Sequence, residues 1–190
     1  MDPIRCWPTT DEGYIQYHDE EWGRPVRDER GIYERLCLEG FQSGLSWLTI
    51  LRKRPAFREA FAGFDPERVA AFGERDVDRL LADAGIVRHR GKIEAAIANA
   101  RSTVALRETG APLHQLFWAH APAAHTAPAS AADWLPTTPE SAALAKRLRS
   151  AGFRFVGPTT VYAAMQACGV VNDHLAGCWV RDDVERERTV

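Results

Sequence analysis

Apolar residues recur every three or four positions along most of the chain, which is the repeat of a helix with one buried face. The clearest runs lie at residues 77–84, 93–104 and 161–168. Asp65-Pro66-Glu67 has the composition of a helix start, with a capping acid, a proline suited to the first turn and a further acid. No segment alternates strictly between apolar and polar residues, so we expect an all-α fold.

Residues 110–140 differ from the rest of the chain, because five prolines stand there among alanines and polar residues. Such a composition favours a long irregular connection, with at most one short helix around Phe117 and Trp118. A connection of this length can separate two lobes. We therefore expect one domain over residues 1–190, whose main helical lobe comprises residues 30–110 and 140–170.

The overall composition changes the picture in two ways. The 190 residues are 45% hydrophobic and 26% charged, which argues against disorder. The 24 Lys and Arg against 26 Asp and Glu give a net charge of −2, so a polyanion could be bound only through local basic patches.

The ends and the cysteines indicate the compartment. Acidic residues interrupt the amino end before any apolar run begins, and no stretch reaches the roughly 18 apolar residues of a membrane helix. Four cysteines are too few for a disulfide scaffold. We expect a cytoplasmic protein without membrane association, whose thiols are reduced or bound to metal.

Two cysteines and two histidines lie near the two ends of the chain: Cys6, His18, His174 and Cys178. The second pair is spaced i, i+4, so both side chains could face one way on a single helical turn. Two thiolates and two imidazoles suit tetrahedral zinc with no open position, which is a structural site that would join segments 1–25 and 170–180. The alternative is a surface histidine and two ordinary buried thiols.

An acid falls on the apolar stripe of a predicted helix. Ile32, Leu36 and Glu39 follow i, i+4, i+7, and a buried carboxylate is costly unless it meets a cation, hydrogen-bond donors or a wet cavity. Aromatic residues are close by in the sequence and could form a pocket for a planar or cationic ligand: Tyr14, Tyr17, Trp22 and Trp47. The alternative is a core cluster beside a capping or salt-bridged acid.

Residues 152–157 form a glycine-bounded turn between two predicted helices, and Pro158 begins the second. The free N–H groups at that start can hold a phosphate. Residues 146–154 carry four basic side chains and no acid, which is a local basic patch. The pattern fits two interpretations equally well: a hairpin that contacts DNA, and a simple hairpin whose basic face is solvated.

Five blocks of the chain resemble the constitutive (type I) 3-methyladenine DNA glycosylases of bacteria, within the helix-hairpin-helix superfamily. They are YIQYHDEEWG (14–23), CLEGFQSGLSW (37–47), AGIVRHRGKI (84–93), GFRFVG (152–157) and MQACGVVNDH (165–174). The likeness covers nearly the whole chain and is weakest in residues 110–140 and after Cys178.

The resemblance implies one structural zinc ion held by the two cysteines and two histidines, and an aromatic pocket for a base flipped out of the duplex. Tyr17 and Trp47 would stack on the base, and Glu39 would be the catalytic residue and would accept hydrogen bonds from the base. Tyr14 and Trp22 would help form the walls. The resemblance also implies that a wedge formed by Gly44 and Leu45 enters the gap that the flipped base leaves in the stack. The hairpin would contact the DNA backbone through Arg154, Gly157 and Thr159.

The implied activity is hydrolysis of the N-glycosidic bond of 3-methyladenine in double-stranded DNA, by a monofunctional, monomeric enzyme that leaves an abasic site at the nucleoid. Many relatives in the superfamily carry a catalytic aspartate beyond the hairpin. Asp173 is the nearest candidate here, but it adjoins His174, and we expect it either to be structural or to support a neighbouring functional side chain. The alternatives are a zinc-stapled DNA-binding module without catalysis and a zinc hydrolase with an open coordination site.

Overall fold

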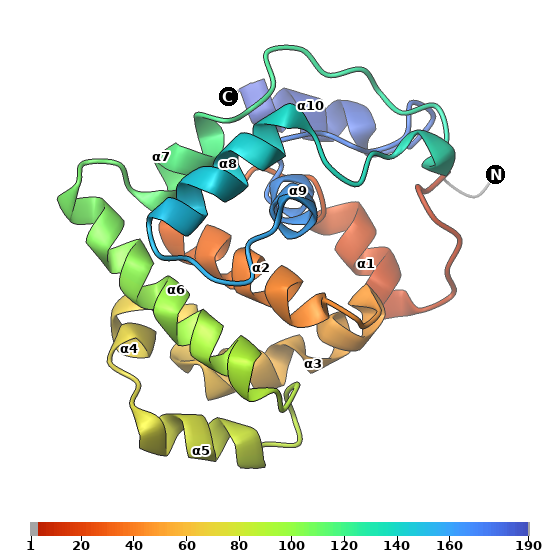
Figure 1. Cartoon of the computed structure of the whole chain (residues 1–190). Coiled ribbons are helices and arrows are strands. Elements are labelled where there is room, and N and C mark those ends of the chain that lie inside the picture. The colour runs from red at the N-terminus through yellow and green to blue at the C-terminus, as the bar shows by residue number, and fades with distance from the viewer. Residues whose placement is uncertain (1–3, 190) are drawn as a thin grey trace.

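The computed structural model describes residues 4–189, and these residues form helices and loops without a strand, as predicted (Figure 1). Two short 3-10 helices, Ala62–Phe64 and Ala131–Asp133, accompany the α-helices. The α-helices are α1 Glu12–Glu20, α2 Glu29–Gln42, α3 Trp47–Ala60, α4 Pro66–Ala70, α5 Glu74–Ala82, α6 Arg90–Glu108, α7 Leu113–Trp118, α8 Pro139–Ser150, α9 Pro158–Ala167 and α10 Arg181–Thr189.

Side-chain caps fix where several helices begin. Asp11, Asp28 and Ser46 accept hydrogen bonds from first-turn backbone N–H groups of α1, α2 and α3. Asp65 caps α4 in the same way, with Pro66 in the first turn, which confirms the start predicted there. These caps orient the three helices that carry the aromatic residues and the acid singled out in the sequence.

The main core surrounds α2, whose apolar face packs between α6 and α9. Ile32 and Leu36 of α2 are fully buried in it, as the periodicity predicts, and Phe41 is buried there as well. A second, smaller cluster consists of Cys6, Cys178 and Val180, with several tryptophans packed against it. The smaller cluster therefore joins the two ends of the described chain.

The proline-rich segment is irregular, as expected, and its one α-helix is α7, around Phe117 and Trp118. Beyond α7 the chain runs as a long loop to α8, interrupted by the short 3-10 helix at Ala131–Asp133 (Figure 1). Main-chain and side-chain hydrogen bonds tie this loop to the segment before α10: Ala176 N donates to Pro128 O, and Trp134 Nε1 donates to Asp173 O.

Helices α8 and α9 form the predicted hairpin. Phe153 and Val156 of its turn are buried, whereas Phe155 is 44% exposed and has a φ of +54°. Gly152 adopts a φ of +93°, a conformation that glycine allows at little cost. The turn packs against α2, because a Cβ added at Gly40 would lie 3.7 Å from Phe155.

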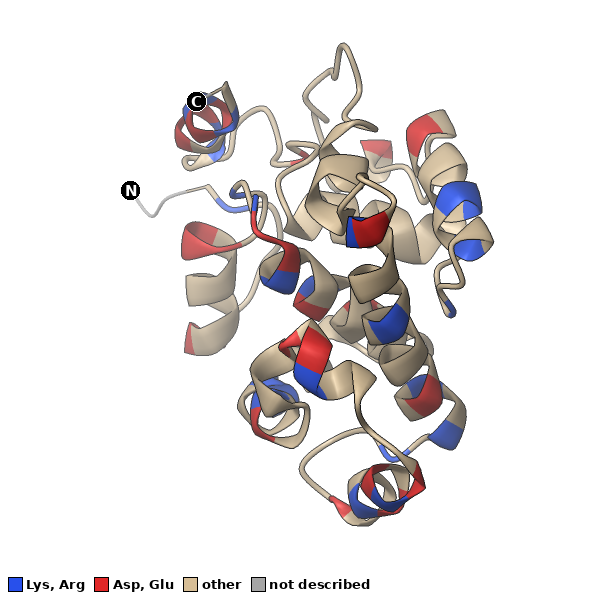
Figure 2. Cartoon of the chain, turned by 90° about the vertical axis from the view of Figure 1, so that its left-hand side faces the viewer, with Lys and Arg blue, Asp and Glu red and all other residues tan. Residues whose placement is uncertain are grey.

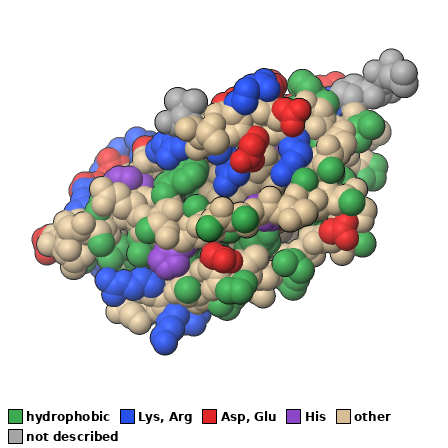
Figure 3. Space-filling model, turned by 90° about the horizontal axis from the view of Figure 1, so that it is seen from above, with side chains coloured by type: hydrophobic (Ala, Val, Ile, Leu, Met, Phe, Trp, Pro, Cys, Tyr) green, Lys and Arg blue, Asp and Glu red, His purple; other side chains and the backbone are tan. Residues whose placement is uncertain are grey.

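Charged residues of both signs are interspersed over the helices in Figure 2, and the face seen in Figure 3 likewise mixes Lys and Arg with Asp and Glu. This distribution agrees with the small net charge of the sequence. Among the described helices, none combines the length and the apolar character needed to cross a lipid bilayer.

Candidate functional site

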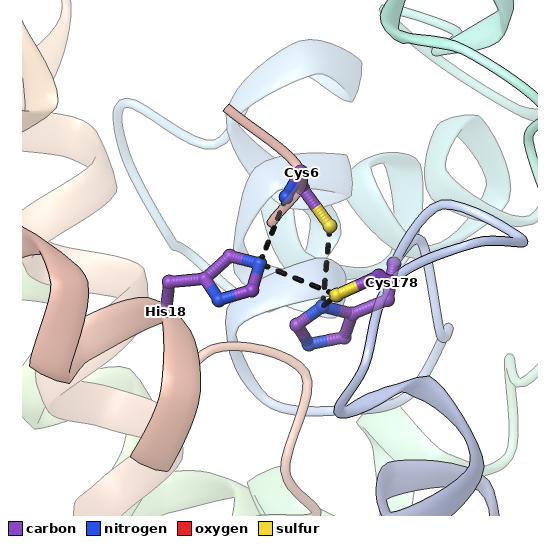
Figure 4. Close-up of side chains that lie close together, drawn as sticks. Cys6, His18 and Cys178 are labelled. Carbon is purple, nitrogen blue, oxygen red and sulfur yellow. Dashed lines mark hydrogen bonds between the residues drawn. The ribbon is translucent and has the colours of Figure 1, made fainter. Parts of the chain in front are cut away.

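The four predicted metal ligands converge from distant parts of the sequence. Figure 4 shows Cys6, His18 and Cys178 pointing toward one another, and His174 completes the group. All four side chains are buried, and their ligand atoms lie within 4.8 Å of one another. A tetrahedral zinc ion holds its ligands roughly 3–4 Å apart, so the donor set and its spacing fit a four-coordinate site.

Hydrogen bonds on the outer side of each ring orient the two imidazoles. His18 presents Nε2 to the centre, and its Nδ1 lies 2.7 Å from Asp19 Oδ1. His174 presents Nδ1 to both sulfur atoms, at 3.3 and 3.4 Å, and its Nε2 donates to Trp22 O at 2.8 Å. Zinc-binding histidines are fixed in the same manner by an acceptor behind the ring.

The two thiols behave as a pair. The side-chain hydrogen bond between them raises the pKa of Cys6 and lowers that of Cys178. Hydrogen bonds from His174 and His18 also lower the pKa of Cys178. A thiol must lose its proton to bind a metal, and the lowered pKa of Cys178 favours that loss at its sulfur.

One detail of the metal prediction is wrong. His174 and Cys178 do not share a helical turn, because the chain from Gly169 to Val180 consists of turns and bends between α9 and α10. A turn closed by Cys178 N donating to Leu175 O brings the two side chains together instead. The i, i+4 spacing therefore indicated the correct pair of ligands, although the segment that carries them is not a helix.

The predicted aromatic residues and Glu39 line one cavity of about 480 Å³, a size typical of small-molecule pockets. Tyr14 and Tyr17 come from α1, Glu39 from α2 and Trp47 from the first turn of α3. The rings of Tyr17 and Trp47 lie 5.3 Å apart at 43°, and those of Tyr14 and Tyr17 lie 6.4 Å apart.

Glu39 lies in this cavity without a countercharge. Its side chain is 7% exposed, and no cation or donor of the described residues bonds to the carboxyl group. Burial alone raises the pKa of Glu39 to about 8. Neither the salt-bridged nor the helix-capping alternative for this acid applies.

The tyrosines share the apolar surroundings of the acid. Burial, and then the negative charge of Glu39, raises the pKa of both Tyr14 and Tyr17. Their hydroxyl groups therefore stay protonated at neutral pH, and Glu39 is the group in the cavity that can carry a negative charge.

Several residues of the cavity wall were not predicted from the sequence. Trp7 contacts the rings of Tyr14, at 5.1 Å, and Trp22, at 5.0 Å, and it also packs edge-on against the ring of His18. Its position next to Cys6 was the available signal, because a ligand at Cys6 fixes its neighbour beside the metal site. The metal site and the cavity thus share a wall.

The proline-rich loop also contributes to the cavity, through Trp134, Leu135 and Pro136, together with Ala163 and Gln166 of α9. The indole of Trp134 packs against Trp7 and Trp22. No local pattern in the sequence marks Trp134, since the contact depends on the path of the long loop.

The predicted DNA-contacting residues lie in two neighbouring turns. Gly44, with a φ of +83°, and Leu45, which is 42% exposed, form the turn between α2 and α3. Arg154 and Thr159 are exposed at the α8–α9 hairpin, and Gly157 is the N-cap of α9. Packing of the hairpin turn near Gly40 places both turns at the same end of α2.

Asp173 is buried and fully engaged, in agreement with the structural role expected from the sequence. Its carboxyl group accepts from Tyr162 Oη and Gln166 Nε2, at 2.7 and 2.6 Å, and lies 2.6 Å from His125 Nε2. Burial would raise the pKa of Asp173, but these partners outweigh it and lower the pKa below its ordinary value. Asp173 does not line the cavity that contains Glu39.

Residues 7–182 match the family model described as methyladenine glycosylase. DNA-3-methyladenine glycosylase 1 of Escherichia coli (strain K12) is 49% identical over 179 residues, which cover 92% of this chain and 95% of that protein. The DNA-3-methyladenine glycosylase of Haemophilus influenzae is 42% identical over 179 residues, with coverage of 92% and 96%.

Solved structures agree with the sequence relatives. A crystal structure of 3-methyladenine DNA glycosylase I superposes with a TM-score of 0.89 at 49% identity, covering 93% of this chain and 98% of that one. A structure concerned with 3-methyladenine recognition by the Staphylococcus aureus enzyme superposes with a TM-score of 0.88 at 34% identity, covering 93% and 95%. Both kinds of similarity span almost the whole chain, and the protein therefore belongs to the methyladenine glycosylase family.

Proposed function

We propose that this protein hydrolyses the N-glycosidic bond of 3-methyladenine in alkylated DNA, releasing the free base and leaving an abasic site. The observation that carries the proposal is Glu39, a buried acid without a countercharge inside an aromatic cavity of suitable size. Relatives that are 49% and 42% identical are named as DNA-3-methyladenine glycosylases, which supports the same substrate here.

The chemistry of the substrate explains why such a cavity suffices. Methylation at N3 makes adenine a cation within DNA, so the glycosidic bond is already labile and the base needs little help from an acid. An everted cation fits between flat rings, where stacking contributes about 1–3 kcal/mol per base and offsets the cost of flipping. Tyr17 and Trp47 supply the stacking, and Tyr14 and Trp22 form walls beside them.

Glu39 provides the complementary charge. A cation that enters the cavity favours the ionised carboxylate, because an opposite charge nearby lowers the pKa of a buried acid. The carboxylate then accepts hydrogen bonds from the base, and its negative charge favours the positive charge that develops on the sugar. Water completes the hydrolysis.

The two turns at the end of α2 handle the DNA. Leu45, beside Gly44, inserts into the stack where the base has left it, since it is an exposed apolar residue in the turn between α2 and α3. The hairpin binds the backbone of the double strand through Arg154, Thr159 and the N–H groups that follow Gly157.

Zinc is the metal that the two thiolates and two imidazoles fit, one ion per chain. Bound zinc would fasten the two ends of the chain and would leave no coordination position for substrate. We also infer that the protein acts as a monomer in the cytoplasm, at the nucleoid.

The test is chromatography of the bases released from methylated duplex DNA, with metal analysis of the same sample. We expect free 3-methyladenine and one zinc per chain. Tight binding of the DNA without release of a base would favour the non-catalytic DNA-binding module and would overturn the proposal. Zinc with three protein ligands and a water molecule would favour a zinc hydrolase.

A further inference from the structure

Gln166 is a cavity residue that has no role in the proposed function. It projects from α9 into the wall of the cavity that contains Glu39. Its Nε2 donates a hydrogen bond of 2.6 Å to Asp173 Oδ2. An amide has one donor end and one acceptor end, and a carboxylate can pair only with the donor end. The bond to Asp173 therefore fixes the orientation of the amide and leaves Oε1 of Gln166 as a free acceptor.

Asp173 is itself held on every side. It is 3% exposed, and Tyr162 Oη donates to the same Oδ2 at 2.7 Å. His125 Nε2 lies 2.6 Å from Oδ1, and the main-chain oxygen of Asp173 accepts from Trp134 Nε1 at 2.9 Å. A side chain fixed by so many partners keeps Gln166 in one orientation, and the same residue also ties Trp134 into the cavity wall.

We propose that Asp173 is a positioning residue that turns the carbonyl oxygen of Gln166 toward the base, so that the cavity selects a purine with an amino group at C6 over one with an oxo group. The inference rests on the proposed function and names the specificity of the same site.

The selection follows from hydrogen-bond chemistry. The exocyclic amine of 3-methyladenine is a donor and can pair with Gln166 Oε1, whereas O6 of 3-methylguanine is an acceptor and would face another acceptor. A free glutamine could rotate its amide by half a turn and serve either base, but the bond to Asp173 prevents that rotation. A site that pairs with a substrate N–H rejects an analogue that lacks it, because the protein group is left unpaired.

The experiment compares Gln166→Leu and Asp173→Asn with the wild-type protein. Gln166→Leu removes the oriented oxygen at similar volume. Asp173→Asn can present either a donor or an acceptor to Gln166, which frees the amide to rotate. The matched control is Gln16→Leu, because Gln16 lies exposed on α1 and donates to Glu20. Zinc content and Tm are measured for each variant.

Two readouts are taken on the same samples: the ratio of 3-methyladenine to 3-methylguanine released from methylated DNA, and the affinity for each free base by calorimetry. We expect both variants to lower the preference for 3-methyladenine by about 5- to 10-fold, the value of one hydrogen bond, with Gln16→Leu unchanged. A merely structural defect would lower the release of both bases, and the affinity for both, by the same factor.

An unchanged ratio in Gln166→Leu would overturn the inference while wild-type release of 3-methyladenine leaves the proposed function intact. A wild-type protein that releases no base would instead refute the proposed function. Should Asp173→Asn fail to fold, Gln166→Leu still decides the matter.

Discussion

The free-energy cost of a charged carboxylate at Glu39 depends on whether the cavity is empty or holds a cationic ligand. In the folded protein burial raises its pKa to about 8, from 4.5 for an ordinary glutamate. The titratable groups that interact with it do not relieve this cost, because Tyr14, Tyr17 and Cys168 all have raised pKa values and stay neutral at neutral pH. The acid thus destabilises the empty protein at alkaline pH and is suited to a cationic guest.

This cost predicts a pH-dependent effect of Glu39→Gln on stability. Between pH 4.5 and about 8 the folded chain keeps a proton on Glu39 that the unfolded chain has released, so the contribution of Glu39 to the free energy of unfolding falls as pH rises. The variant should gain stability relative to wild type from about pH 5 to about pH 8.5, by roughly 2–4 °C in Tm for each kcal/mol. Thermal unfolding measured across this range would contradict the account if the difference stayed constant.

Trp47 tests the stacking role at the same scale. Trp47→Ala should weaken binding of free 3-methyladenine by roughly 5- to 150-fold, since stacking contributes about 1–3 kcal/mol per base. Trp179→Ala is the control, because its ring is 49% exposed and lies outside the cavity. Calorimetry that finds equal losses in the two variants would rule out stacking on Trp47.

Individual residues were predictable where their chemistry conflicts with their position. Glu39 was recognised because an acid stood on an apolar stripe, and Cys6 and His18 because they form a zinc donor set with the carboxyl end. Trp134 and Gln166 carry no such conflict. Their place in the cavity follows from the path of the loop before α8 and from a hydrogen bond to Asp173, neither of which a sequence pattern records.

At the level of elements, a buried lysine donates hydrogen bonds to the main chain at the turn between α2 and α3. Lys92 Nζ of α6 donates to Phe41 O and Ser43 O, at 2.9 and 2.6 Å. These carbonyl groups end α2, where a cation is favoured by the helix dipole. The bonds fix the chain immediately before Gly44 and Leu45, so Lys92 determines where the proposed wedge points.

Replacing Lys92 with methionine should separate DNA handling from base binding. We expect Lys92→Met to lower release of 3-methyladenine from duplex DNA and to leave the affinity for the free base within about twofold, because an exposed turn that loses one or two hydrogen bonds becomes less ordered. The measurements are base release and calorimetry.

Lys53→Met is the matched control, since Lys53 Nζ also donates to two main-chain carbonyls, those of Ala84 and Gly85, which do not belong to the turn between α2 and α3. Equal losses of duplex activity in both variants would mean that Lys92 acts only through general stability.

The elements themselves followed largely from the sequence. The apolar repeats predicted α5, α6 and α9, and the acid–proline pair at residues 65 and 66 located the start of α4. The loop at residues 169–180 was the exception. Its two ligands have helical spacing, but its backbone is shaped by turns and by Arg181, which donates to the main-chain oxygens of Asn172 and His174.

For the whole molecule, the four-ligand site is the connection between the two ends. Cys6 and His18 are separated from His174 and Cys178 by more than 150 residues, and the small core beside them consists of few apolar side chains. A metal that binds only the folded arrangement adds its binding free energy to folding. Trp7 packs against His18 and Trp22 packs against His174, and both tryptophans also line the cavity. We therefore expect a less ordered metal site to disorder the cavity wall as well.

Removal of the metal should therefore weaken the fold and the cavity together. Cys178→Ser should lose bound zinc and lower Tm by several degrees, and a chelator should do the same to the wild-type protein. Cys37→Ser is the control, because Cys37 is buried in the main core and belongs to no ligand group among the described residues. Full zinc content in Cys178→Ser would contradict the assignment of this ligand.

The proposed function depends above all on recognition of a cationic base by the carboxylate of Glu39. The most direct test is the rate at which Glu39→Gln releases 3-methyladenine from methylated duplex DNA. The amide keeps the shape of the side chain and removes its charge. We predict a rate about 10- to 100-fold below wild type, the loss expected for one charge-assisted hydrogen bond, with zinc content and the folded structure retained. Wild-type activity in this variant would contradict the role of Glu39.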